Sequence, residues 1–218
     1  YGIYSFSKAT GEILWKLLPD STTMIDDYRQ AIIDNDIIYI IGKFKSQNKS
    51  TLYTYTLRDK IKINEIDIPK EVITNIVLCD NNLIFGTGQS IMAREIFSIN
   101  KDDFKINWQL KQNIDHSSTI LLNKKNSVFF NFENQLFELN CNSLEVKQRF
   151  KLPNNYFELF GIKDNQLICT KNSSLILYSL TNSNEKYFKD VMTNGPWEFN
   201  NEIYFVNKTL IKKISELE

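Results

Sequence analysis

The chain has 218 residues, of which 42% are hydrophobic and 24% are charged, and its 26 basic and 26 acidic side chains give a formal net charge of zero. A neutral chain lacks the overall basic charge that generic binding to nucleic acids or anionic membranes requires. No apolar stretch is long enough for a membrane-spanning helix, and no signal-peptide pattern opens the chain. The composition therefore favours a partner other than a nucleic acid or a membrane.

Turns rich in Asn and Asp recur along the chain, and each is followed by a short apolar strand. The first apolar residues after these turns are Ile37, Leu83, Val128, Leu167 and Ile203. The turns recur roughly every 40 residues in units that contain strands alone, which is typical of β-propeller blades, because solenoids of similar period carry helices.

Each repeat predicts four strands. A first strand precedes the Asn-rich turn, as at 72–78, and a buried apolar strand follows it, as at 37–41. A third strand alternates apolar and polar residues, as at 52–57, and an outer strand such as 144–150 mixes apolar with charged residues. Four antiparallel strands per unit is the composition of a propeller blade.

These strands predict an all-β fold, with a single β-propeller domain over residues 1–218. The strand count is compatible with five or six blades, and the N-terminal strands would complete the ring. The predicted order is a partial blade at 1–18, full blades at 27–67, 72–110, 117–151 and 156–189, and a last blade at 196–214.

The N-terminal repeat carries a recognisable motif, formed by Tyr4, Phe6, Thr10, Gly11 and Trp15. In its spacing this segment resembles the tandem repeat of the quinoprotein (pyrroloquinoline-quinone-type, WD-like) propellers, with Ser where that family usually has Asp. The resemblance implies the fold. Quinoprotein dehydrogenases hold their cofactor with two adjacent cysteines and a calcium-binding acidic cluster, and this chain has no adjacent cysteines. We therefore expect no cofactor.

The residues that usually carry catalysis are sparse. His116 is the only histidine, which excludes a site with several histidine ligands, so we expect no metal. Asp115, His116 and Ser117 are the residue types of a hydrolase triad, but sequence neighbours rarely assemble into one. The glycine-rich run 86–90 leads into a strand, so it predicts a hairpin loop and not a phosphate cradle. We predict no catalytic residues and no enzyme activity.

Cysteine usage and composition bear on location and origin. The odd number of cysteines, with Cys79 and Cys169 at strand positions, predicts buried free thiols and favours a cytoplasmic location. Richness in Asn, Lys and Ile indicates an AT-rich genome, as in many bacteria.

One face of the predicted propeller collects candidate partner-binding residues. Loops that enter the innermost strands, and loops that join the second and third strands, gather there. Tyr, Trp and Arg beside acidic groups are typical of protein-binding surfaces, although ordinary solvated loops are the alternative. The predicted partner-binding residues are Asp26, Asp27, Tyr28, Arg29, Glu71, Asp115, His116, Tyr156, Glu158 and Trp197.

Two functions follow from this pattern. The first is a non-catalytic protein-binding propeller, specifically a bacterial immunity (antitoxin) protein that blocks a toxin domain, with acidic loops mimicking phosphate charge towards a basic nuclease. The second is an enzyme, or a protein that binds a sugar or peptide in the central channel. The predicted first strands are mostly apolar and offer few carboxylates, which favours the first function.

Overall fold

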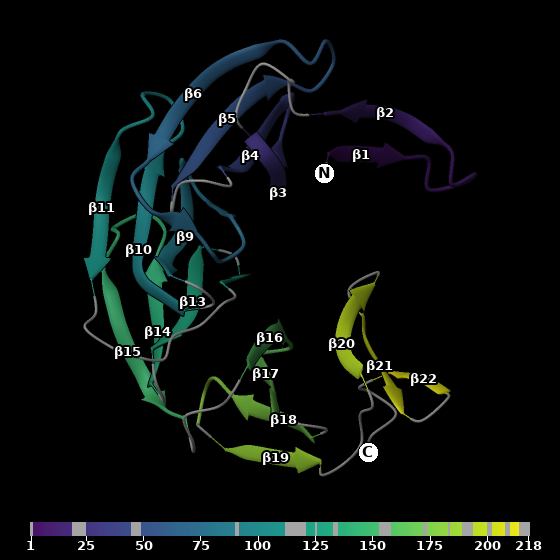
Figure 1. Ribbon diagram of the computed structural model, residues 1–218. Helices are drawn as coiled ribbons and strands as arrows, with labels where there is room; N and C mark the ends of the chain where they lie inside the picture. The colour runs from purple at the N-terminus through teal and green to yellow at the C-terminus, as the bar shows by residue number, and fades with distance from the viewer. Residues whose placement is uncertain are drawn as a thin grey trace. The chain divides into compact units, whose positions relative to one another are not determined.

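In the computed structural model the chain is all-β and has no helix among the described residues, so none there is long and apolar enough to span a membrane. It divides into two compact units, Tyr1–Asn113 and Ile114–Glu218, which are described separately (Figure 1). The described residues are 2–18, 25–44, 49–89, 92–111, 121–124, 126–132, 135–152, 158–171, 174–182, 184–188, 194–199, 202–207 and 210–213.

The first unit contains three antiparallel sheets among its described residues. A two-stranded sheet pairs β1 (Ile3–Phe6) with β2 (Ile13–Leu17). A four-stranded sheet follows in sequence order, consisting of β3 (Ile25–Asp34), β4 (Ile37–Phe44), β5 (Ser50–Thr56) and β6 (Lys62–Ile68). In the third sheet β9 pairs with β10, β10 with β11, and both β7 and β8 with β9; its strands are β7 (Glu71–Val72), β8 (Val77–Cys79), β9 (Asn82–Gln89), β10 (Met92–Asn100) and β11 (Ile106–Lys111).

The second unit also contains three antiparallel sheets within its described ranges. Two are four-stranded and one is three-stranded, each in sequence order. They are formed by β12 (Leu122–Lys124), β13 (Ser127–Phe132), β14 (Gln135–Asn140) and β15 (Val146–Lys151); by β16 (Glu158–Lys163), β17 (Gln166–Lys171), β18 (Ser174–Ser179) and β19 (Glu185–Phe188); and by β20 (Asn194–Phe199), β21 (Glu202–Asn207) and β22 (Leu210–Lys213). The all-β, antiparallel prediction is confirmed, while ring closure and the number of blades stay predictions.

Four of these sheets repeat the same backbone link between their two turns. The N–H of the residue that follows the third strand donates to the carbonyl of a residue in the turn between the first two strands. This link fixes the two turns side by side at one edge of each sheet, which we call the turn edge. The donors are Leu57, Lys101, Cys141 and Leu180, and the acceptors are Asp36, Asn81, Asn126 and Asn165, at N–O distances between 2.6 and 3.0 Å.

The turn before the outer strand also repeats its backbone conformation. Gly11 has φ +74°, and at the corresponding position Lys60, Phe104 and Leu144 have φ between +55° and +57°. Each of these residues donates its N–H to the carbonyl four residues earlier, at 2.8 to 3.0 Å. The turn of the quinoprotein-like motif is therefore retained where its glycine is not.

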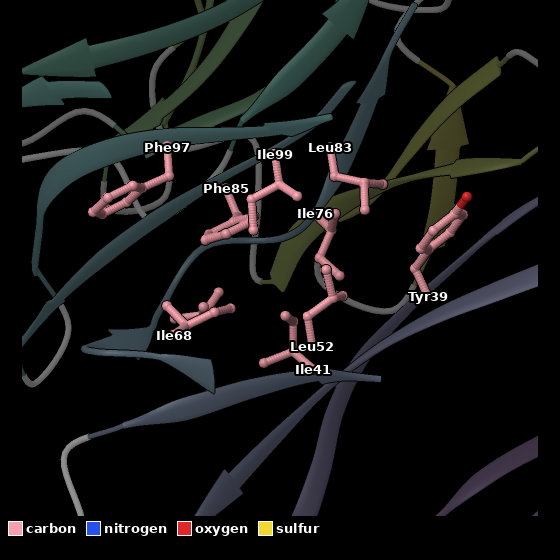
Figure 2. Packing of buried hydrophobic residues seen from close by; sticks show 10 residues of the cluster. Tyr39, Ile41, Leu52, Ile68, Ile76, Leu83, Phe85, Phe97 and Ile99 are labelled. Atoms are coloured by element: carbon pink, nitrogen blue, oxygen red, sulfur yellow. The ribbon is translucent and has the colours of Figure 1, made fainter. Parts of the chain in front are cut away.

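Apolar side chains fill the space between the two larger sheets of the first unit. Ile41 and Leu52 come from the sheet β3–β6, and Phe85, Phe97 and Ile99 come from the sheet β7–β11 (Figure 2). Phe85 and Phe97 stack with ring centroids 6.2 Å apart. Packing of this kind holds the strands, and therefore the side chains at their ends, in fixed positions.

A second core lies between the sheets β12–β15 and β16–β19. Phe129 and Leu136 from the first of these sheets pack with Leu167, Ile176 and Tyr178 from the second.

The cysteines are all buried, but in different states. Cys169 is a free thiol within the second core, as predicted, and burial raises its pKa. Cys79 and Cys141 are disulfide-bonded, so the prediction of a free thiol at Cys79 is wrong. Disulfides are rare in reducing compartments, and the cytoplasmic location stays a prediction.

Two strand predictions in the first unit differ from the structure. The strand expected at 72–78 is interrupted between β7 and β8, because the N–H groups of Ile73 and Thr74 both donate to the carbonyl of Gly86. The Thr74 hydroxyl also accepts from the Gly86 N–H at 2.6 Å. The predicted hairpin loop at the glycine-rich run instead belongs largely to β9, which continues to Gln89.

Candidate functional site

The strand ends opposite the turn edge carry the predicted partner-binding residues of the first unit. Asp26, Asp27, Tyr28 and Arg29 were expected in a loop, but their backbone belongs to β3. Two register shifts, between Ile25 and Asp27 and between Tyr28 and Gln30, show that this strand is bulged there. The side chains of these four residues lie outside the described part of the structure.

The other predicted residues are described only in part. Asp115, His116 and Tyr156 lie outside the described residues. Glu158 begins β16, and Trp197 lies within β20, opposite Tyr204, and not in the loop expected for it. The side chains of both residues lie outside the described part, so no contact among these five residues is assigned.

Glu71 is the one predicted residue whose side chain is described, and it is buried at 7% exposure. It lies in β7, opposite Gly88 of β9, and the next N–H, that of Val72, donates to the Ser50 hydroxyl at 2.9 Å. A buried carboxylate is not available as an exposed contact for a partner. Glu71 is the first residue of β7 and does not lie in the loop expected for it, while its role in partner binding stays a prediction.

A cluster of charged residues that the sequence analysis missed lies at the same strand ends. Glu95 of β10 is only 6% exposed, and its Oε1 accepts from the Lys70 ammonium at 2.7 Å. The Lys111 ammonium, at the end of β11, lies 3.8 Å from the same oxygen. The two lysine side chains are 49% and 67% exposed, respectively. Glu95 precedes Ile96 in a strand where polar and apolar residues alternate, so the sequence pattern places it on the exposed face and does not indicate its burial.

This cluster is suited to binding more than to catalysis. The carboxylate of Glu95 is already neutralised by lysines, and its second oxygen, Oε2, is buried without a hydrogen-bond partner, as is the Thr87 hydroxyl opposite it. Among the described residues no group of three His, Cys, Asp or Glu side chains is placed to hold a metal ion. The described part of this edge includes the partly exposed ammonium groups of Lys70 and Lys111, which both lie near Glu95.

A pocket of about 540 Å³ lies in the second unit, at the turn edge of the sheets β12–β15 and β16–β19. Phe129 forms part of its wall, and Lys124, Arg149 and Asn165 contribute polar groups. A second pocket, of about 280 Å³, shares Arg149 and Glu138 with it. The two hollows therefore border the same pair of charged side chains.

Hydrogen bonds fix the charged wall of this pocket. The Ser127 hydroxyl donates to Glu138 Oε1 at 2.6 Å, and Arg149 Nε lies 3.1 Å from Glu138 Oε2. Glu138 thus accepts from Ser127 with one oxygen and pairs with the Arg149 guanidinium through the other, which orients Arg149. Within the part of the chain that the structure describes, the terminal nitrogens of Arg149 have no partner and remain available to a ligand.

Comparison with known proteins supports the architecture. No family model and no curated protein matches the chain. The crystal structure of BamB from Moraxella catarrhalis is similar over 94% of this chain and 64% of that chain, with a TM-score of 0.59 and 11% sequence identity. The structure of the computationally designed Ika8 protein is similar over 94% of this chain and 74% of that chain, with a TM-score of 0.60 and 9% identity.

BamB is a quinoprotein-like β-propeller. The fold is β-propeller-like. At these identities the similarity concerns the fold alone, and the chain spans less than two thirds of the length of BamB.

Proposed function

We propose that the protein is a non-catalytic binding protein that contacts another protein through the strand ends opposite the turn edge. The observation that carries the proposal is the pairing of Lys70 and Lys111 with the buried Glu95. The pairing places the partly exposed ammonium groups of Lys70 and Lys111 at the strand ends, and the Glu95 carboxylate is too buried to react with a substrate.

The rigidity of this edge favours recognition. A charge that is held in place by a buried partner loses little side-chain entropy on binding. Its field also selects partners of complementary charge and raises their rate of association. The described part of the edge would attract acidic groups of a partner.

The more specific proposal is an immunity protein that covers a toxin domain. Phosphate mimicry by acidic side chains would then depend on Asp26, Asp27, Asp115 and Glu158. The proposal predicts that expression of the chain protects cells against a toxin encoded beside its gene. Survival that depends on the chain supports it, and unchanged killing contradicts it.

The general proposal is tested by quantitative cross-linked capture from source cells with matched variants. Lys111→Gln removes a charge at one end of β11, and Lys105→Gln removes one just before its other end, where the side chain is 80% exposed. We expect a partner that is captured by the unaltered protein and by Lys105→Gln, and is lost with Lys111→Gln.

The predicted acidic contribution is tested in the same assay. Asp26→Lys combined with Asp115→Lys should abolish partner capture and leave the melting temperature nearly unchanged. Identical captured proteins for all variants, or unfolding of the double variant, would contradict the assignment of this face.

A further inference from the structure

In each unit two successive sheets meet at their turn edges, β3–β6 with β7–β11 and β12–β15 with β16–β19, and the residues at the two junctions correspond in position. Asp34 and Lys124 are each the last residue of a first strand, paired with the residue three positions later. Lys101 and Leu180 each follow the third strand of the next sheet and donate their N–H to Asn81 and Asn165, respectively. The side chains at these positions differ in charge.

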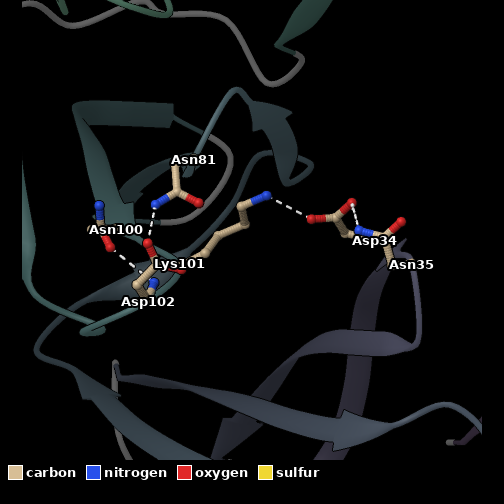
Figure 3. Close-up of polar contacts among 6 residues, drawn as sticks. All are labelled: Asp34, Asn35, Asn81, Asn100, Lys101 and Asp102. Carbon is tan, nitrogen blue, oxygen red and sulfur yellow. Dashed lines mark hydrogen bonds and ion pairs between the residues drawn. The ribbon is translucent and has the colours of Figure 1, made fainter.

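In the first unit the junction is closed by an ion pair. The Lys101 ammonium lies 2.6 Å from Asp34 Oδ2 (Figure 3). Asp102 follows Lys101 in the turn after β10, and its carboxylate accepts from the side-chain amide of Asn81. Tyr39 lies near both carboxylates: burial first, and then Asp34 and Asp102, raise its pKa. The junction therefore carries two carboxylates and one ammonium.

In the second unit neither carboxylate is present. Lys124 replaces Asp34, Leu180 replaces Lys101, and Thr181 replaces Asp102, while Asn165 keeps the role of Asn81 by donating to the Thr181 hydroxyl at 3.2 Å. The Lys124 ammonium donates to Asn165 Oδ1 at 2.9 Å. In the described ranges no carboxylate pairs with Lys124, so its charge is not neutralised.

The pocket of about 540 Å³ lies at this junction and is lined by Lys124, Leu180, Thr181 and Arg149. Arg149 is oriented by Glu138, and that pair is neutral overall. Lys124 therefore leaves an excess of one positive charge in the lining. The volume falls within the range of about 300–1,000 Å³ typical of ligand sites.

We propose that this pocket binds a carboxylate group, which pairs with Lys124 as Asp34 pairs with Lys101 in the first unit. The terminal nitrogens of Arg149 supply further donors, and the apolar Phe129 and Leu180 contact the carbon chain that bears the carboxylate. The ligand is a small carboxylic acid or an acidic side chain of a peptide. This site is independent of the strand ends assigned to the protein partner.

The test is an NMR titration that follows the side-chain N–H signals of Lys124 and Arg149. The probes are glutarate, and a pair of blocked tripeptides, acetyl-Gly-Glu-Gly-amide and acetyl-Gly-Gln-Gly-amide, which differ only in charge. We expect saturable shifts with glutarate or the Glu peptide, and none with the Gln peptide. Glutarate binding alone indicates a free carboxylic acid, and binding of the Glu peptide indicates a protein side chain.

Three variants make the test specific. Lys124→Met removes the ammonium, and Thr181→Asp restores a carboxylate at the position of Asp102, in an exposed turn that should tolerate it. Because a hydrogen bond to a charged group contributes strongly, each should weaken binding about tenfold or more. Lys151→Met, at the end of β15, has the same change of charge as Lys124→Met and should leave binding unchanged.

The outcomes decide the proposal. No saturable response to either carboxylate probe would overturn it. An equal response to the Gln peptide, or unchanged affinity in both Lys124→Met and Thr181→Asp, would overturn it as well. Binding that survives only in the unaltered protein and in Lys151→Met supports it.

Discussion

The Lys101 ammonium forms an ion pair of 2.6 Å with the Asp34 carboxylate, which comes from the neighbouring sheet and is 67 residues away in sequence. The two side chains are only 15% and 27% exposed, so the pair is largely shielded from water. It joins the turn edges of the sheets β3–β6 and β7–β11 to each other.

Lys101→Met is expected to lower the free energy of unfolding by about 1–3 kcal/mol, because it leaves the Asp34 carboxylate partly buried without a cation. Urea unfolding followed by fluorescence measures the change. Lys105→Met is the control, since its ion pair with Asp103 is longer, 3.4 Å, and exposed, and its loss should not be measurable. Equal effects of the two substitutions would show that the Asp34 pair is not shielded.

The left-handed turn described before the outer strand in four sheets predicts that substitution by glycine has different effects on stability at Lys60, in the turn, and at Lys62, in the strand. Gly11→Ala should cost about 1 kcal/mol, from backbone strain alone, since an added Cβ meets no atom within 4 Å. Lys60→Gly should be nearly neutral, because relief of φ +56° offsets the entropy of glycine. Lys62→Gly, within β6, should cost about 1 kcal/mol. Thermal unfolding of the three variants measures this order, and a reversal for Lys60 and Lys62 would contradict it.

The number of cysteines that react with a thiol reagent should depend on whether the protein is unfolded and whether its disulfide-bonded cysteines are reduced. The native protein should react slowly with a thiol reagent at neutral pH, because burial raises the pKa of the Cys169 thiol and excludes the reagent. Denaturation should expose one thiol, and denaturation with a reductant should expose all three cysteines of the chain. Three thiols without reductant would show that Cys79 and Cys141 are reduced and would contradict the disulfide assignment.

Tyr53 predicts a loss of stability at alkaline pH. Burial, the largest cause, raises its pKa to about 12 from the ordinary value of 10.0. The folded state therefore retains the phenol proton while the unfolded state loses it, so the stabilisation is complete below pH 10 and is lost as the pH rises from 10 to about 12. Urea unfolding across this range should show a steeper decline for the unaltered protein than for Tyr53→Phe. Parallel declines would contradict the assignment.

Local turn chemistry made the antiparallel framework predictable. Asp164 and Asn165 both adopt positive φ, 46° and 65°, as expected for an Asn-rich two-residue hairpin turn, and the buried apolar strand β17 follows it. The same reasoning could not find the left-handed turn at Phe104 and Leu144, since neither residue type favours positive φ and the tertiary packing overrides that preference.

Side-chain environments were less accessible to sequence reasoning than strands. Glu71 was expected in a loop on the partner-binding face, yet it is the first residue of β7 and is buried. The buried Glu95 pairs with Lys70, which is 25 residues earlier, and a local sequence pattern cannot predict such a contact. Strand bulges at Asp26 likewise depend on the partner strand and not on the segment itself.

The backbone links that join the turns of each sheet are made by peptide groups, which nearly every residue possesses. Asp34 and Lys124 occupy the same backbone position with opposite charges, and the hydrogen-bonded frame around them is the same. A repeat protein built in this way separates its scaffold from its specificity. Substitution of two or three side chains at one junction replaces an ion pair between sheets with the proposed ligand pocket. A new binding site can therefore arise while the strands keep their backbone structure.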